Sequence, residues 1–302
     1  MTTRGVLVMA YGTPVDLDHV EEYYRDILRG RQPPTELLED LTARYRAIGG
    51  SPLLEITRAQ AAGIGARLDG VEPYLGQKHA APFIADAIDA MATDGVEEAV
   101  GLVLAPHFSR MSVGDYEARA RGAAEARGWS GGLETIESWH LEDGYVEYLV
   151  REVKIALDAL SAPARERSEV VFTAHSLPAR ILETGDPYPE QLQATADAVG
   201  GRAGLERWRI AWQSAGHTRD PWLGPDITET IATLAAGGAT GVVVCPCGFV
   251  ADHLEVLYDV DIEAARVASE SGIGLTRTRM PNDDSAFLDM LAEVVMRRFS
   301  KQ

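Results

Sequence analysis

The sequence predicts an α/β protein built around two parallel sheets, and two observations carry this prediction. Short runs rich in β-branched and apolar residues alternate with amphipathic stretches along the whole chain, which is the pattern of βα units. These runs fall into two sets of four, separated by a long amphipathic stretch at 145–160 and a polar segment at 161–168. We therefore expect two similar domains, 1–143 and 144–284, and a final helix within 285–302 that packs back on the first domain.

The eight expected strands are short apolar or β-branched runs with turn-forming or polar residues on either side. The clearest is 241–245, which reads Gly-Val-Val-Val-Cys and ends directly before Pro246. In chain order, the strands are expected near 5–9, 71–75, 99–104, 133–136, 170–173, 208–212, 241–245 and 274–278.

The expected helices are stretches in which apolar residues recur every three or four positions. Most of them lie between two expected strands, where a parallel sheet needs a crossover connection. In chain order, the helices are expected near 18–28, 36–48, 57–68, 83–93, 113–126, 145–160, 190–199, 226–236, 251–268 and 285–299.

The composition excludes several classes of protein. The 302 residues include 28 Lys and Arg against 46 Asp and Glu, a formal net charge of −18, and 46% are hydrophobic. This hydrophobic content excludes a disordered chain, and the negative charge argues against nucleic-acid binding and docking on anionic membranes. No apolar run approaches the roughly 20 residues that a membrane-spanning helix needs, and the short apolar run at 5–9 leads us to expect a strand there and no signal peptide. We therefore expect a cytoplasmic protein without nucleic-acid or membrane partners.

Common cofactor motifs do not follow the expected strands. Neither G-x-G-x-x-G nor G-x-x-x-x-G-K-[ST] occurs there, which disfavours nucleotide chemistry. The two cysteines, Cys245 and Cys247, are too few for a disulfide framework or for a four-thiolate cluster, and we expect them to fill a strand end.

Two features of the first domain indicate a binding site. Tyr11 follows the first strand, at the sheet edge where α/β proteins bind ligands, so its phenol can ligate or hydrogen-bond there. A packed ring with a wet hydroxyl is the alternative. A cluster of arginines in an acidic chain could bind a carboxylate ligand, or could belong to a solvated helix face: Arg25, Arg29, Arg31, Arg44 and Arg46.

Two features of the second domain indicate proton transfer and metal binding. His175 ends the fifth strand, where it could accept protons near neutral pH or could be structural. Glu255, Asp259 and Glu263 are spaced by four residues, so they would lie on one face of a regular helix. Carboxylate oxygens suit hydrated divalent cations, while an exposed acidic face is the alternative.

At this point the sequence resembles the ferrochelatases, most closely the soluble Gram-positive branch that acts on coproporphyrin. The matching stretches occur in the family's order along nearly the whole chain. They are Val8–Pro14, Arg44–Tyr45 with Ile48–Leu53, Ala105–Phe108, Ala174–Pro178, Gln213–Gly216, Pro221–Asp226 and Gly248–Asp259.

The resemblance implies two Rossmann-like domains with a porphyrin cleft between them, and insertion of ferrous iron with loss of two pyrrole protons. It implies that His175 and Glu255 form the catalytic pair at the metal, and that Asp259 and Glu263 belong to an acidic path with a divalent ion such as Mg²⁺. Tyr11 corresponds to an axial ligand of the porphyrin iron. The residues expected to contact the porphyrin or its propionates are Tyr11, Arg29, Arg31, Arg44, Tyr45, Ser51 and Tyr116.

Three departures from the family pattern concern propionate binding. Leu28 stands in place of the first arginine of the usual Arg-Arg-Gly-Arg motif, so either Arg29 or Arg31 substitutes for it or propionate binding is weaker there. The glycine-rich loop before Pro52 is one residue shorter, which alters the reach of Ser51. Arg110 stands where relatives commonly carry Ser and could restore the lost charge. The four cysteines that hold an iron–sulfur cluster in some relatives are not all present, so we expect no cluster.

The expected activity is conversion of coproporphyrin III to coproheme in haem biosynthesis, with ferrous iron as substrate and no prosthetic group. The alternatives are a protoporphyrin IX ferrochelatase, a cobalt or nickel chelatase for another tetrapyrrole, and a non-catalytic porphyrin or haem carrier. We expect a monomer that meets an iron donor or other haem-pathway enzymes.

Overall fold

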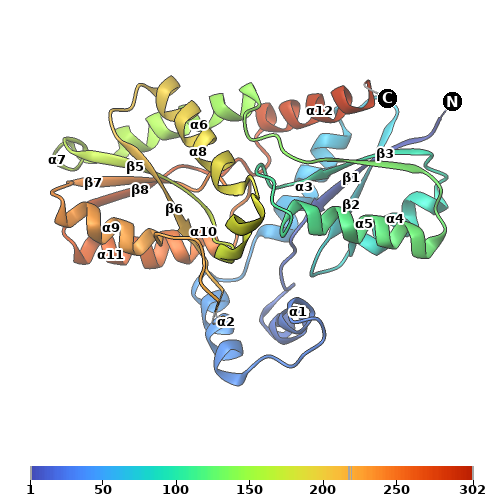
Figure 1. Cartoon of the computed structure of the whole chain (residues 1–302), viewed down its shortest axis with the longest axis horizontal. Helices are drawn as coiled ribbons and strands as arrows, with labels where there is room; N and C mark the ends of the chain where they lie inside the picture. The colour runs from blue at the N-terminus through green and yellow to red at the C-terminus, as the bar shows by residue number, and fades with distance from the viewer. Residues whose placement is uncertain (1, 217, 219, 301–302) are drawn as a thin grey trace.

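Two parallel sheets form the centre of the protein, as the sequence predicts. The computed structural model describes residues 2–216, 218 and 220–300. The first sheet has the order β2-β1-β3-β4 and the second has the order β6-β5-β7-β8. The two sheets lie in opposite halves of the molecule (Figure 1). All strand pairs are parallel, and all eight expected strands are confirmed: β1 (Arg4–Ala10), β2 (Val71–Gln77), β3 (Glu98–Val103), β4 (Gly132–Ile136), β5 (Ser168–His175), β6 (Trp208–Gln213), β7 (Gly241–Cys245) and β8 (Gly274–Arg277).

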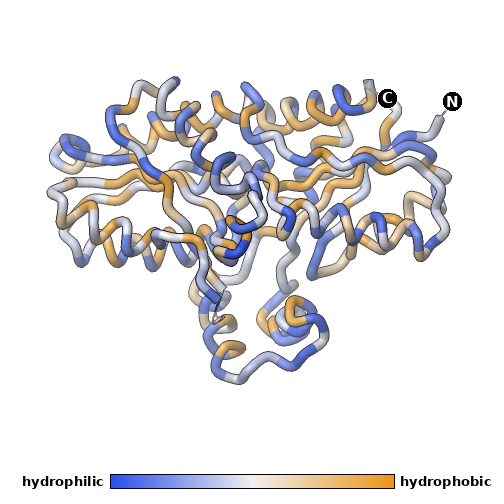
Figure 2. Tube along the Cα trace, in the orientation of Figure 1, coloured by the Kyte–Doolittle hydropathy of each residue, from blue (hydrophilic) through white to orange (hydrophobic). Residues whose placement is uncertain are grey.

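The strands are continuous apolar runs because helices cover both faces of each sheet. In β1, Val6 and Val8 face one core, Leu7 and Met9 face another, and all four are fully buried. Figure 2 shows the same arrangement in both halves, with hydrophobic strands between helices that carry hydrophilic residues outward.

Every expected helical region contains helix, with changed limits in several places. The α-helices are α1 (Val20–Ile27), α2 (Thr35–Ala47), α3 (Leu53–Gly65), α4 (Ile84–Thr93), α5 (Val113–Arg127), α6 (Asp143–Ala159), α7 (Ala162–Arg165), α8 (Tyr188–Ala203), α9 (Ile227–Ala236), α10 (Leu254–Leu257), α11 (Ala265–Glu270) and α12 (Ser285–Phe299). Short 3₁₀ segments lie at η1 (Leu17–His19) and η2 (Ala179–Thr184). The sequence did not predict η2 or α7, whose first turn is capped by Ser161.

The expectation of one regular helix over 251–268 is wrong. The chain forms α10, then a π-helical segment, η3 (Asp259–Ala264), and then α11. The amide of Glu263 donates to the carbonyl of Tyr258 at 2.9 Å, a bond that spans five residues and widens the turn. Asp259 and Glu263 therefore do not keep the regular-helix spacing assumed from the sequence.

The helix α12 lies over the first half of the molecule, near the chain's N-terminus in Figure 1. It packs against α3 and β3 of that half and also against α6. Its Phe287 contacts Trp139, Tyr145 and Tyr148 in a core that includes residues of both sheets. Residues 301 and 302, which belong to the expected C-terminal segment, lie outside the described residues.

The helices α1 and α2 form a hairpin that projects from the body of the protein (Figure 1). The hairpin has a small apolar core of Val20, Tyr23 and Tyr45, against which Leu254 of α10 packs. This contact joins the hairpin to the segment that carries Glu255.

Candidate active site

A cleft of about 420 Å³ lies where the carboxyl ends of strands from the two sheets face each other. The first sheet contributes Tyr11 and Lys78, which follow β1 and β2, and the second contributes His175 and Glu255. This is the edge at which parallel α/β sheets bind ligands, because the loops after the strands converge there.

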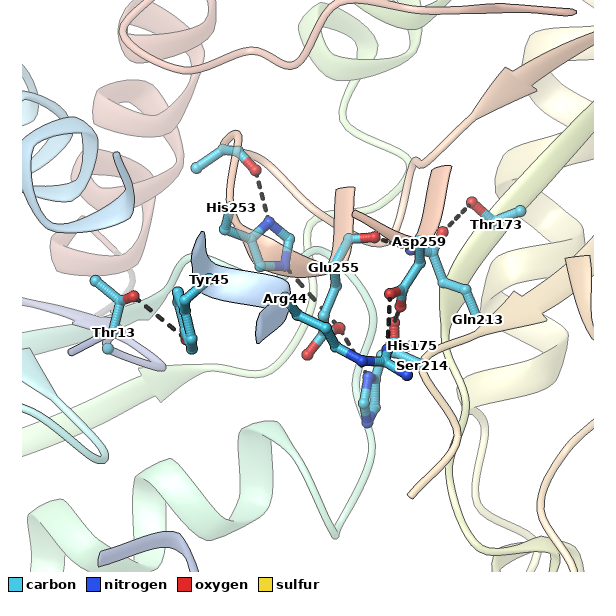
Figure 3. Close-up of polar contacts among 12 residues, drawn as sticks. Thr13, Arg44, Tyr45, Thr173, His175, Gln213, Ser214, His253, Glu255 and Asp259 are labelled. Atoms are coloured by element: carbon cyan, nitrogen blue, oxygen red, sulfur yellow. Dashed lines mark hydrogen bonds and ion pairs between the residues drawn. The ribbon is translucent and has the colours of Figure 1, made fainter. Parts of the chain in front are cut away.

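His175 and Glu255 form a direct pair in this cleft. The His175 Nδ1 lies 2.9 Å from Glu255 Oε2 (Figure 3). Both backbones are held by side chains, since the Tyr188 hydroxyl donates to the His175 carbonyl at 2.9 Å and Gln213 donates to the Glu255 carbonyl at 2.7 Å. Hydrogen bonds to the backbone carbonyls therefore fix the main chain of both residues of the pair.

The two partners stabilise each other's charged forms. Burial disfavours the Glu255 carboxylate, but the charge and the hydrogen bond of His175 outweigh it and lower the pKa of Glu255 to about 2. Burial likewise disfavours a charged His175, and the Glu255 charge and hydrogen bond outweigh it, so the pKa of His175 is raised. Below that raised pKa, the resting site holds an imidazolium beside a carboxylate.

His253 is a further member of this site to which the sequence reasoning assigned no role. Its Nε2 lies 4.0 Å from Glu255 Oε2, while its Nδ1 lies 2.9 Å from the Ala251 carbonyl. Burial lowers the pKa of His253, so the ring is neutral and its Nδ1 carries the proton donated to Ala251. The signal in the sequence is its position two residues before Glu255.

Asp259 lies behind the pair and is bound from two sides. The Ser214 hydroxyl donates to Oδ2, and Arg44 Nη1 lies 3.4 Å from Oδ1 (Figure 3). Burial raises the pKa of Asp259 to about 7, helped by Glu255 and Glu263 and opposed by Ser214 and Arg44. Asp259 can therefore exchange a proton near neutral pH.

The acidic residues do not converge as a metal-ligand cluster in this arrangement. Among the described residues, no group of three or more His, Cys, Asp or Glu side chains is placed to hold a metal ion. Both oxygens of Asp259 already have partners, Ser214 and Arg44. The residues as placed here thus do not fit a resident divalent ion at Asp259 and Glu263.

On the opposite side of the cleft, Tyr11 presents its ring to the cavity. The ring packs on His79 at a centroid distance of 4.7 Å, and burial followed by the Glu255 charge raises the pKa of Tyr11. The phenol is therefore neutral in the free enzyme. Tyr45, Ser51 and Tyr116 also line the cleft, as the sequence analysis expected of porphyrin-contacting residues.

The expected arginines are not among the residues that line the cleft. Arg44 pairs with Asp40 and Asp259 and lies over the Tyr258 ring at 4.9 Å. Arg31 donates to the Leu28 carbonyl, and the exposed Arg29 has a left-handed backbone with φ of 56°. Arg110 donates to the Thr184 carbonyl and does not line the cleft either.

Lys78 is a cation in the cleft that the sequence reasoning missed. Its Nζ lies 5.0 Å from the centre of the Tyr116 ring, and it pairs with Asp115 at 2.5 Å. Burial lowers its pKa despite the Asp115 carboxylate. The available signal was its place directly after β2.

Comparison with solved structures identifies the fold. The fold matches SirB from Bacillus subtilis with Fe³⁺ at a TM-score of 0.65 and 12% identity, covering 100% of this chain and 98% of that chain. It also matches CbiX, the terminal enzyme for biosynthesis of siroheme in denitrifying bacteria, at a TM-score of 0.58 and 13% identity, covering 97% and 99% of the two chains. Identities this low show the fold alone, and it is the two-domain, Rossmann-like fold of the chelatases.

Comparison by sequence gives the family. The ferrochelatase model matches residues 3–299. The coproporphyrin III ferrochelatase of Geobacillus thermodenitrificans is 48% identical over 308 residues, covering 99% of this chain and 97% of that protein. Coproporphyrin III ferrochelatase 1 of Bacillus cereus (strain ATCC 10987 / NRS 248) is 47% identical over 302 residues, covering 97% of each chain. The chain belongs to the ferrochelatase family and is a metal chelatase that acts on a porphyrin and ferrous iron.

None of the helices in the described part of the chain has both the length and the apolar character needed to cross a bilayer.

Proposed function

We propose that this enzyme inserts ferrous iron into coproporphyrin III and forms coproheme, a step of haem biosynthesis. The observation that carries the proposal is the His175–Glu255 pair in the cleft, in a chain that matches coproporphyrin III ferrochelatases over almost its whole length. We assign His175 and Glu255 as the catalytic residues, which also bind the incoming iron.

The reaction exchanges one ferrous ion for two pyrrole protons, so it needs a base and no redox partner. A ferrous ion at Glu255 neutralises the carboxylate that holds the His175 proton, which lowers the pKa of His175. The imidazole then releases its proton to solvent, accepts a proton from one pyrrole nitrogen, passes it to solvent and accepts the second pyrrole proton in the same way. Asp259, whose pKa is about 7, can take up protons behind the pair.

The opposite wall of the cleft is proposed to hold the macrocycle. Tyr11 is assigned as the axial ligand on the face away from Glu255, and Tyr45, Ser51 and Tyr116 as contacts of the substrate. Lys78 is added as a cation for a propionate. Arg29, Arg31 and Arg44 remain proposed propionate contacts, and Arg44 must leave Asp259 to make one.

The experiment is a steady-state assay of the purified enzyme under anaerobic conditions. Ferrous iron with coproporphyrin III should quench free-porphyrin fluorescence at a higher kcat/KM than with protoporphyrin IX. A preference for protoporphyrin IX would overturn the substrate assignment. Tight binding of coproporphyrin without insertion would instead indicate a carrier, and faster insertion of cobalt or nickel into another tetrapyrrole would indicate a different chelatase.

We infer that a divalent ion such as Mg²⁺ can bind Asp259 and Glu263 only when Arg44 releases Asp259. Magnesium should then bind more tightly to an Arg44→Ala variant than to the wild type in calorimetry, and equal affinity would contradict this. We also propose a cytoplasmic monomer without an iron–sulfur cluster that receives iron from a donor. Sedimentation of the purified enzyme tests whether it is a monomer, and iron–sulfide analysis tests whether it holds a cluster.

A further inference from the structure

Three segments that are distant in the sequence meet beside the cleft. They are α3, through Gln60, the loop 250–253 between β7 and α10, and the connector 278–284 between β8 and α12. Gln60, Val250 and Ala251 also line the cleft. The loop ends with His253 and leads directly to Glu255.

Asn282 of the connector uses its backbone and its side chain at this junction. Its amide donates to the Val250 carbonyl at 3.0 Å, and its carbonyl accepts from Gln60 Nε2 at 2.9 Å. Its side chain pairs with Asp252 in both directions, since Oδ1 accepts from the Asp252 amide and Nδ2 donates to Asp252 Oδ2, each at 2.8 Å.

The backbone of Asn282 is in the left-handed region, with φ of 47°. Asn adopts this conformation more readily than other residues with a side chain, apart from Asp. Glycine would satisfy the backbone but could not form the side-chain pair with Asp252. The position therefore requires both the left-handed turn and the amide.

The junction connects the two halves of the molecule at the segment that carries Glu255. Gln60 belongs to α3, which packs against α12, and α12 begins shortly after Asn282. Gln60 Nε2 also donates to the Val250 carbonyl at 3.1 Å. The loop before Glu255 is thus bound to α3 and to the connector together.

We propose that Asn282 is a positioning residue that fixes the loop 250–253 so that Glu255 lies opposite His175. The inference rests on the proposed function, because it assigns the role of Asn282 through Glu255. It gives a reason for an unusual backbone and a reciprocal side-chain pair at a residue that does not itself line the cleft.

An exchange of the paired side chains tests the proposal. Asn282→Asp places two carboxylates against each other, which displaces the loop, although Arg277 at 3.2 Å from Asp252 reduces the repulsion. We expect kcat for iron insertion to fall at least tenfold, with KM for coproporphyrin III within twofold of wild type. The double variant Asp252→Asn/Asn282→Asp restores one amide and one carboxylate, so kcat should return to within about threefold of wild type.

Two further variants keep the test decisive. The exposed neighbour Asp283→Asn changes one charge outside the pair and should keep wild-type kcat. Asn282→Gly retains the left-handed turn without the amide and should lower kcat even where its melting temperature is close to wild type. A double variant no faster than Asn282→Asp, or an Asn282→Gly enzyme with full kcat, would overturn the inference.

Different results would refute the proposed iron insertion and the proposed role of Asn282. A wild-type enzyme that does not insert iron would refute the proposed function and this inference with it. The role of Asn282 alone would be refuted if the wild type is active, Glu255→Gln inactivates it, and the Asn282 variants keep the wild-type kcat.

Discussion

His175 and Glu255 meet because β5 and β7 are neighbours in one sheet and end at the same edge. The sequence predicted each residue separately, from its position after a strand and from the family resemblance. It could not predict the polar groups that hold them, since Tyr188 and Gln213 come from other segments. Lys78 escaped notice for the same reason, because only the fold places it beside the rings of Tyr11 and Tyr116.

Replacing Glu255 tests the coupling within the pair. In Glu255→Gln the largest influence that raises the pKa of His175 is lost, so that pKa should fall toward or below its ordinary value of 6.5. Iron insertion should slow at least 100-fold. NMR titration of the histidines and the fluorescence assay measure the two effects.

The matched control is Glu293→Gln at an exposed position of α12, which should change neither the pKa of His175 nor the rate of iron insertion. An unchanged pKa of His175 in Glu255→Gln would contradict the coupling. The raised pKa of His175 also affects the free energy of unfolding. A raised histidine pKa contributes stability that is complete below the unfolded pKa and is lost as the pH rises through the folded value.

The stability of the protein should also depend on pH through Asp259, whose pKa is raised by burial and not by a partner of opposite charge. Its folded pKa of about 7 exceeds its ordinary 3.8, so the folded state binds the extra proton between these values and stability falls as the pH rises through that window. Asp259→Asn mimics the protonated form. It should be more stable than wild type at pH 8 by roughly 1–3 kcal/mol, with the difference vanishing near pH 4.

Thermal melts of both proteins across pH 4–8 measure this effect. Asp283→Asn, at an exposed position, should show no such trend. A variant less stable than wild type at pH 8 would show that the contacts with Ser214 and Arg44 outweigh the cost of burying the charge.

At the scale of elements, the segment after β7 is where the sequence misled most. The residues 251–268 alternate apolar and polar side chains in a manner typical of an α-helix, and a widened turn leaves little trace in such a pattern. Asp259, the first residue of the widened segment, is bound by two tertiary partners, Ser214, whose φ is 60°, and Arg44 of the hairpin. Neither contact could be inferred from local sequence.

The contacts of Arg44 attach the hairpin of α1 and α2 to the segment that carries Tyr258 and Asp259. Arg44→Ala removes the contacts of α2 with Asp259 and with the Tyr258 ring, so amides of α1 and α2 should exchange hydrogen several-fold faster. The loss of overall stability should be about 1–3 kcal/mol, because the Arg44 side chain is only 23% exposed and its removal leaves the buried Asp259 without one partner. Hydrogen exchange read by mass spectrometry measures both.

The exposed Arg46→Ala on the same helix is the control and should leave exchange unchanged. Equal exchange in Arg44→Ala and wild type would mean that the apolar contact of Leu254 with the hairpin suffices.

At the scale of the molecule, the sequence predicted the two sheets, their strands and a terminal helix, because strand patterns buried on both faces are strong local signals. It did not predict that one core would join the halves through α6 and α12. The domain limits at 143 and 144 remain a prediction, since α6 begins at that point and packs against α12.

This shared core predicts a single unfolding transition. Phe287→Ala removes a fully buried ring that contacts Trp139, Tyr145 and Tyr148, and should cost about 3–5 kcal/mol. Denaturant unfolding followed by fluorescence and by circular dichroism should give coincident curves in both proteins. Two separated transitions in the wild type would show that the halves unfold independently.

The strand order of the first sheet recurs unchanged in the second, so β1 and β5 occupy the same place in their sheets. The residue after β1 is Tyr11, and the last residue of β5 is His175. These two side chains therefore lie at the same end of corresponding strands, one from each half of the molecule. A flat molecule bound along the seam between the halves would meet one half on each face. The two strand ends then give those faces different chemistry, a phenol on one and an imidazole on the other.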